Sequence, residues 1–148
     1  MEPMEFIKVS GKFNIKLIGP DGLVKEERDV NNVITTAGKT FLASWLAAAS
    51  QASPFMNYIG IGTGTTSVSA SDTALQTELT RKATTVTSST NVWQAVVTFN
   101  AGEGTGAISE SGVLSASSSG TLLSHQVFTV INKAAADSLQ ITWQVTFA

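Results

Sequence analysis

The stretch of this sequence that most resembles a chemical site is glycine-rich, at residues 60–64, where Gly-Ile-Gly-Thr-Gly ends an apolar run. Such a loop binds phosphate when a helix begins directly behind it, or when a lysine follows its last glycine. Thr65 and Thr66 stand where a P-loop has its lysine, and the third glycine comes one residue too early for a dinucleotide-binding loop. We therefore expect no nucleotide or other cofactor, and a strand that ends in a glycine loop packed close to a neighbour.

The only histidine, His125, is the next candidate for catalysis. A catalytic triad needs a nucleophile and an orienting acid, and the sequence contains no Gly-x-Ser-x-Gly elbow. A lone histidine without cysteines is also a poor transition-metal site. The carboxylates that a calcium site or a glycosidase pair would need are Asp72, Glu78, Glu103 and Glu110, and their spacing matches neither. We predict no catalytic residue, no metal site and no enzyme.

Two further groups of residues allow a functional and a structural interpretation. Tyr58, Trp93 and Trp143 would make a platform for stacking sugars, but both tryptophans share strand faces with aliphatic residues, which favours a core position. Glu110 lies between apolar positions, and we expect it to pair with Arg81 or Lys82.

Composition excludes several classes of partner. The chain has 148 residues, 43% of them hydrophobic and only 14% charged, whereas 17 serines and 19 threonines supply small hydroxyl groups. This composition suits one β-rich domain with threonine on its outward faces. The net charge of −2 and the lack of a basic stripe argue against nucleic acid and against an anionic membrane surface. We expect a soluble protein, made in the cytoplasm of its host cell without a signal peptide.

The charges are unevenly distributed along the chain. Residues 83–148 contain only four charged side chains, namely Glu103, Glu110, Lys133 and Asp137. Interface cores are depleted in charge, so this half is a candidate for contact with other subunits. The alternative is an exposed sheet solvated by serine and threonine, and the composition leaves both open.

Alternating apolar residues and turn signals predict about eight strands and one inserted helix. The clearest strand covers 139–147, and Gly19-Pro20-Asp21-Gly22 predicts the turn of an N-terminal hairpin. The helix is expected near 36–49, capped by Thr35 or Thr36, with its Phe41/Leu42/Trp45/Leu46 stripe in the core. A short helical turn is expected from Ser71 or Asp72 to Leu79. The whole chain, 1–148, is predicted to be a single antiparallel two-sheet sandwich of jelly-roll or immunoglobulin-like type, with 1–5 as a flexible or swapped arm.

Four pieces of the sequence follow one another in a distinctive order: the Asn31–Lys39 segment, the Ile59–Thr66 glycine stretch, Asp72-Thr73-Ala74-Leu75 with Glu78 and Arg81, and the Asn132–Trp143 segment. Taken together, they resemble a group of small virion proteins of tailed bacteriophages. The resemblance covers nearly the whole chain. It implies a structural role without enzymatic residues, but it does not distinguish a capsid protein from a tail-fibre protein.

Two roles follow as expectations. The first is a capsid cement or decoration protein, a dimer or trimer that clamps major capsid subunits in the virion. The second is a tail or tail-fibre component that contacts tail proteins, with binding of a host-surface glycan as an additional expected role. The contacts are expected from residues 1–7, 62–70 and 101–106, and the individual residues are Met1, Met4, Phe6, Thr63, Thr65, Thr66, Val68, Glu103 and Thr105.

Overall fold

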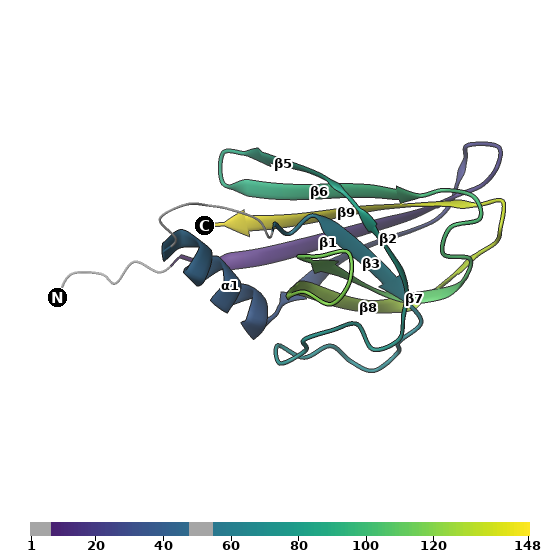
Figure 1. The fold of residues 1–148 in the computed structure, drawn as a ribbon. Helices are drawn as coiled ribbons and strands as arrows, with labels where there is room; N and C mark the ends of the chain where they lie inside the picture. The colour runs from purple at the N-terminus through teal and green to yellow at the C-terminus, as the bar shows by residue number, and fades with distance from the viewer. Residues whose placement is uncertain (1–6, 48–54) are drawn as a thin grey trace.

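The protein is mainly β, with nine antiparallel strands and one helix in the residues that the computed structural model describes, 7–47 and 55–148 (Figure 1). The elements are β1 (Val9–Ile18), β2 (Val24–Ile34), α1 (Thr36–Ala47), β3 (Tyr58–Gly62), β4 (Glu78–Ala83), β5 (Thr85–Ser89), β6 (Val92–Phe99), β7 (Gly106–Leu114), β8 (Leu122–Lys133) and β9 (Ser138–Phe147). The predicted arm, 1–5, lies outside the described residues, as do the last two positions of the predicted helix.

The strands follow one hydrogen-bonded order, β4-β3-β7-β8-β2-β1-β9-β6-β5. β2 joins the two halves, because it pairs with β1 along most of its length and with β8 only through Val33 and Ile34. The outermost strands, β4 and β5, are consecutive in the chain and nearly close the sheet. The Thr84 hydroxyl donates to the Val96 carbonyl oxygen over 2.6 Å, and Lys82 Nζ donates to the Thr98 carbonyl oxygen over 3.0 Å. The mainly-β prediction with one inserted helix is confirmed at this level.

The main core lies where the alternating strands bury one face. The predicted hairpin is present as β1 and β2, and β1 also pairs with β9 along its full length. The Phe13 ring centroid lies 4.7 Å from that of Trp143 and 5.3 Å from that of Phe128. Trp143 is fully buried, as the alternation predicted, and the half-buried Trp93 packs against the edge of the same cluster.

Helix α1 begins where a threonine caps it. The Thr35 hydroxyl oxygen accepts a hydrogen bond from the Gly38 amide over 2.9 Å, which satisfies one of the free N–H groups of the first turn. Gly38 is the only buried residue of the helix within its described bounds, and it packs on the backbone of Leu123 in β8. The helix therefore approaches the sheet through its backbone.

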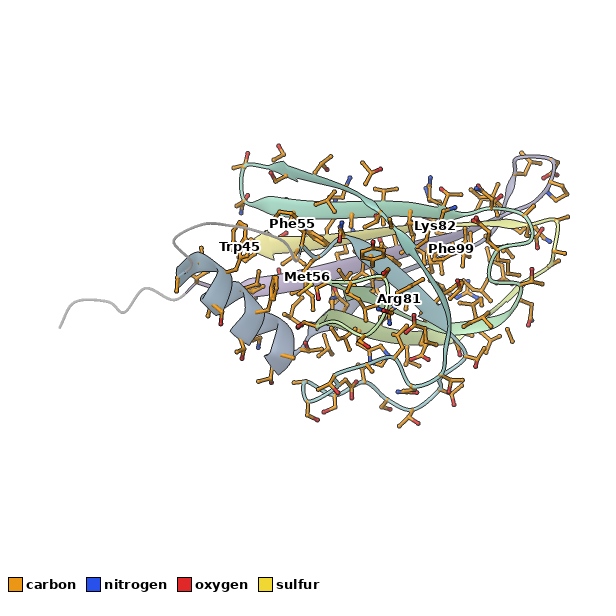
Figure 2. All side chains as sticks on the ribbon, in the orientation of Figure 1. Trp45, Phe55, Met56, Arg81, Lys82 and Phe99 are labelled. Carbon is orange, nitrogen blue, oxygen red and sulfur yellow. The ribbon has the colours of Figure 1, made fainter. Side chains whose placement is uncertain are left out.

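The apolar stripe of the helix lies at the margin of the core, where Phe41 and Leu42 pack against the buried cluster. Phe41, Leu42 and Trp45 are half-buried and line an apolar groove of about 570 Å³ together with Phe55, Met56 and Trp93. Leu46 points away and is 77% exposed, so its predicted core position is wrong. Figure 2 shows Trp45, Phe55 and Met56 at the same end of the molecule, beside α1. The short contact at Gly38 leaves the larger side chains at the margin of the sheet.

The predicted helical turn from Ser71 to Leu79 is also wrong. This segment forms turns without helix, and β4 begins at Glu78. Asp72 does not cap a helix; its carboxylate accepts a hydrogen bond from the Ser69 amide over 2.9 Å and turns the chain back on itself.

Replacing Gly38 tests the helix contact. In an exposed helix, Gly→Ala stabilises by about 1 kcal/mol. Here a Cβ at Gly38 would lie 2.7 Å from the Cα and the carbonyl oxygen of Leu123. We expect Gly38→Ala to lower the free energy of unfolding by about 1 to 3 kcal/mol, measured by urea titration. Ala43→Gly, at an exposed position of α1, is the control and should cost about 1 kcal/mol. A stabilising Gly38→Ala would contradict the contact.

Candidate functional site

A long loop, residues 63–77, covers the outer face of β3, β7 and β8 (the teal loop beneath β7 and β8 in Figure 1). Gly60 and Gly112 are paired across β3 and β7 and leave a hollow on this face. Leu75 fills it, since a Cβ at either glycine would lie within 2.9 Å of the Leu75 side chain. Leu114 and Leu122 complete a small apolar cluster that is buried but separate from the main core.

The carboxylate of Glu110 fastens this loop to β7. It is fully buried and accepts hydrogen bonds from four donors. Oε1 accepts from the amides of Gly64 at 3.0 Å and Thr77 at 2.7 Å, and Oε2 lies 2.9 Å from both the Gln76 amide nitrogen and His125 Nε2. Both ends of the loop therefore meet on one side chain. We call Glu110, His125 and Asp72 the latch.

His125 connects Glu110 to the middle of the loop. Its ring is fully buried in β8, and its Nδ1 lies 2.8 Å from Oδ2 of Asp72, whose side chain is 24% exposed. Burial raises the pKa of Asp72, but the hydrogen bond from the Ser69 amide, the hydrogen bond from His125 and the charge of that ring together outweigh it and hold the pKa below its ordinary value. Asp72 is therefore an ionised acceptor at neutral pH.

Neutral hydrogen bonds complete the attachment of the loop. The Ser109 hydroxyl donates to the carbonyl oxygen of Gly64 over 2.8 Å, and the Ser111 hydroxyl donates over 2.8 Å to that of Gly60 in β3, just before the loop. The Gln76 side chain accepts from the Thr66 amide and donates to the carbonyl oxygen of the same residue. The Ala70 carbonyl oxygen accepts from the Thr36 amide over 2.7 Å, so the loop also holds the first turn of α1.

The glycines at the start of the loop make room for the Glu110 carboxylate. A Cβ at Gly62 would collide with the Thr77 carbonyl oxygen and with Glu110, and a Cβ at Gly64 would lie 2.7 Å from Glu110 Cδ. The glycine stretch thus makes room for a carboxylate of the same chain and contributes one amide to it, that of Gly64, while Gln76 and Thr77 contribute the other two.

The geometry of the latch suits fastening of the loop. The Glu110 carboxylate is occupied by backbone amides, and the imidazole lies between two carboxylates with no exposed atom. Because the His125 ring lies between Asp72 and Glu110, the two carboxylates do not face a common site. Within residues 7–47 and 55–148, no group of three histidine, cysteine or acidic residues is placed to hold a metal ion.

Glu110 pairs with neither Arg81 nor Lys82, so the predicted ion pair is wrong. Arg81 pairs with Glu78, with Nε and Oε1 2.5 Å apart, and also donates to carbonyl oxygens of the turn that follows β7. Lys82 pairs with Glu103 at 2.6 Å. Both basic residues lie on β4, two strands away from β7, so His125 on the adjacent strand reaches Glu110 instead.

A second group of charges joins the turns at the opposite end of the sheet from α1. Glu103 accepts from the Asn100 amide as well as from Lys82, and these hydrogen bonds, that of Lys82 foremost, lower the pKa of Glu103. Asp137 pairs with Lys25 at 3.1 Å. The buried Lys133 donates to the Asn100 carbonyl oxygen, and burial lowers the pKa of Lys133. These contacts hold the β1–β2, β6–β7 and β8–β9 turns together.

The residues that were expected to contact a partner differ in how far the structure leaves them accessible. Thr63, Thr65, Thr66 and Thr105 are exposed and Val68 is half-buried, so these side chains are available for contact. Glu103 is half-buried and occupied by Lys82. Met1, Met4 and Phe6 lie outside the described residues.

No protein-family model, curated protein or solved structure matches this chain. In the described part of the chain, no helix is long and apolar enough to cross a membrane.

Removal of the Glu110 carboxylate tests the latch. Glu110→Ala leaves three backbone amides and a buried histidine without their acceptor. We expect the free energy of unfolding to fall by about 3 to 5 kcal/mol, measured by urea titration. Glu103→Ala removes a half-exposed carboxylate that accepts one amide hydrogen bond, and it should destabilise clearly less. Equal losses in the two variants would contradict a special role for Glu110.

Low pH should weaken the hydrogen bonds that the Asp72 carboxylate accepts from the Ser69 amide and from His125. Because the folded-state pKa of Asp72 is lowered, its stabilising contribution is present above its ordinary pKa of 3.8 and is lost as pH falls through the folded value. The difference in unfolding free energy between the wild type and Asp72→Asn should therefore shrink as pH is lowered into that range. Thr73→Ala, an exposed neighbour that does not titrate, should show a difference independent of pH. A constant difference for Asp72→Asn would contradict the assignment.

Proposed function

We propose that this chain is a non-enzymatic structural protein of a tailed-bacteriophage virion, and most specifically a capsid cement or decoration protein. The resemblance in sequence supports the class. The observation that carries the proposal is the outer surface of the 63–77 loop, which is poor in charge, rich in hydroxyl groups and fastened from beneath by Glu110.

The composition of that surface suits a protein–protein contact. Asp72, the only charged residue between 63 and 77, is turned toward His125. The exposed residues of the loop are Thr63, Thr65, Thr66, Ser67, Ser69, Ala70, Ser71, Thr73, Ala74, Gln76 and Thr77. Interface cores are depleted in charge, and a loop that is already ordered loses little conformational entropy on binding.

The partner under this proposal is the major capsid protein in its assembled form. A protein that binds the assembled shell and not its free subunits stabilises the shell by mass action. The chain would act as a dimer or trimer, synthesised in the bacterial cytoplasm and retained in the virion. We further propose that the two halves of the sheet, joined by β2, face each other as a sandwich of jelly-roll or immunoglobulin-like type.

The apolar groove beside α1 favours one alternative, a tail or tail-fibre component. Trp45 and Trp93 line this groove, and Phe55 at its edge is 48% exposed. Aromatic side chains at a surface are typical of interfaces and of sugar-stacking sites. This second role includes contact with a host-surface glycan.

The number of copies per particle distinguishes the two roles. Quantitative mass spectrometry of purified virions should give a number comparable with that of the major capsid protein if the chain decorates the shell. A number corresponding to one or a few small rings indicates a tail component. Absence of the chain from virions would contradict both.

A charge on the loop surface should interfere with particle binding without unfolding the protein. Thr66 is exposed and its hydrogen bonds to Gln76 use only its backbone, so Thr66→Arg should keep the unfolding midpoint within a few degrees of the wild type. We expect its occupancy on capsids lacking the native protein to fall at least tenfold, measured by co-sedimentation. Ser117→Arg, in the exposed turn after β7, is the matched control. Equal occupancy of both variants would exclude this loop as the contact.

The N-terminal residues provide a second test of the contact surface. Deletion of residues 1–6 should reduce occupancy on the same capsids and leave the unfolding midpoint unchanged. Unchanged occupancy would remove the N-terminus from the contact surface and leave the loop as its main part.

A further inference from the structure

The latch contains one group whose hydrogen-bonding pattern changes with a single proton. Both ring nitrogens of His125 face carboxylate oxygens, Nδ1 toward Asp72 at 2.8 Å and Nε2 toward Glu110 at 2.9 Å. A neutral imidazole donates from one nitrogen and accepts at the other, whereas an imidazolium donates from both. With both carboxylates ionised, only the imidazolium makes both contacts hydrogen bonds.

Loss of the proton affects the two contacts unequally. Glu110 is fully buried and would remain held by three backbone amides. Asp72 is partly exposed and can turn to water, which solvates a carboxylate well. A neutral ring therefore keeps its remaining N–H on Glu110 and leaves Asp72 facing a nitrogen lone pair.

The other charged groups near this face do not replace the proton. Val33, the partner of His125 on β2, does not titrate. On β4, Arg81 and Glu78 are bonded to each other through two contacts of 2.5 and 2.6 Å. Lys39 on α1 is exposed. Among the described residues, Asp72 and Glu110 are the charged groups in direct contact with the ring.

We infer that the 63–77 loop is a proton-controlled cover: it is fastened along its whole length while His125 carries a proton, and its 69–73 segment is released when that proton is lost. Release breaks the contact of Ala70 with the Thr36 amide and so frees the first turn of α1. It also loosens the attachment of Leu75, which follows this segment by two residues and fills the hollow at Gly60 and Gly112. This inference goes beyond the proposed function and does not depend on it.

A single introduced cysteine can report the release, because the chain has none of its own. In Leu75→Cys the thiol belongs to the loop and faces the hollow at Gly60 and Gly112, where Leu75 is only 7% exposed. Its reaction rate with a soluble aromatic disulfide, divided by the rate of the same chain unfolded in urea at the same pH, gives the protection by the loop. The measurement is repeated at intervals from about pH 5 to about pH 9.

We expect this protection to fall about tenfold or more from the acid to the alkaline end, as the loss of one charge-assisted hydrogen bond predicts. Thr66→Cys, on the exposed loop surface, should be unprotected throughout. Val113→Cys, on the opposite face of β7 and in the main core, should stay protected throughout. A parallel loss of protection at Val113→Cys would show global unfolding and overturn the inference.

Two second-site variants assign the effect to the proton of His125. In Leu75→Cys with His125→Gln, the protection should no longer change with pH. If that chain does not fold, Leu75→Cys with Asp72→Ala gives the decision, because it removes the carboxylate whose hydrogen bond depends on the proton. A pH dependence retained in the folded variant, or absent from Leu75→Cys alone, would overturn the inference.

Discussion

A buried carboxylate is the constraint on which this structure depends. Glu110 lies in the middle of β7 without contact to solvent, and an ionised carboxylate in such a place is strongly destabilising unless several donors surround it. The chain supplies three backbone amides from one loop and a histidine from the next strand. The same loop also covers the face of the sheet from which Glu110 projects. It therefore both buries the carboxylate and supplies the hydrogen bonds that the buried carboxylate needs. Without the loop the charge would be exposed, and without the charge the loop would lose the point where its ends meet.

The attachment extends from the sheet to the helix. The loop bonds to the first turn of α1 through Ala70, and α1 in turn packs through Gly38 on the backbone of Leu123 in β8. Leu123 precedes His125 by two positions in the same strand. This half of the molecule therefore has three layers: the main core, the strands β3, β7 and β8, and the loop with its own apolar cluster. Burial on both faces explains why β7 is built from small residues around a single charge, since only small side chains leave room for a covering loop.

The sequence predicted what depends on local pattern. Strict alternation identified β9 and the buried Trp143, turn chemistry identified the β1–β2 hairpin, and a threonine before the helix identified its cap. The latch was not predictable in this way, because Gly64 and Glu110 are 46 positions apart and Asp72 and His125 are 53 apart. The glycine stretch carried a true signal of anion binding, but a phosphate is only one of the anions that backbone amides bind. The only available hint of the real partner was a lone glutamate among small buried residues in a stretch without alternation.

Amide hydrogen exchange of the native protein, resolved by residue, tests the central claim most directly. If Glu110 fastens the loop, the amides of Gly64, Gln76 and Thr77 exchange as slowly as those of β3 and β7, although they belong to a loop that lacks regular secondary structure. Exchange of these three amides as fast as that of their exposed neighbours Thr65 and Ser67 would contradict the account.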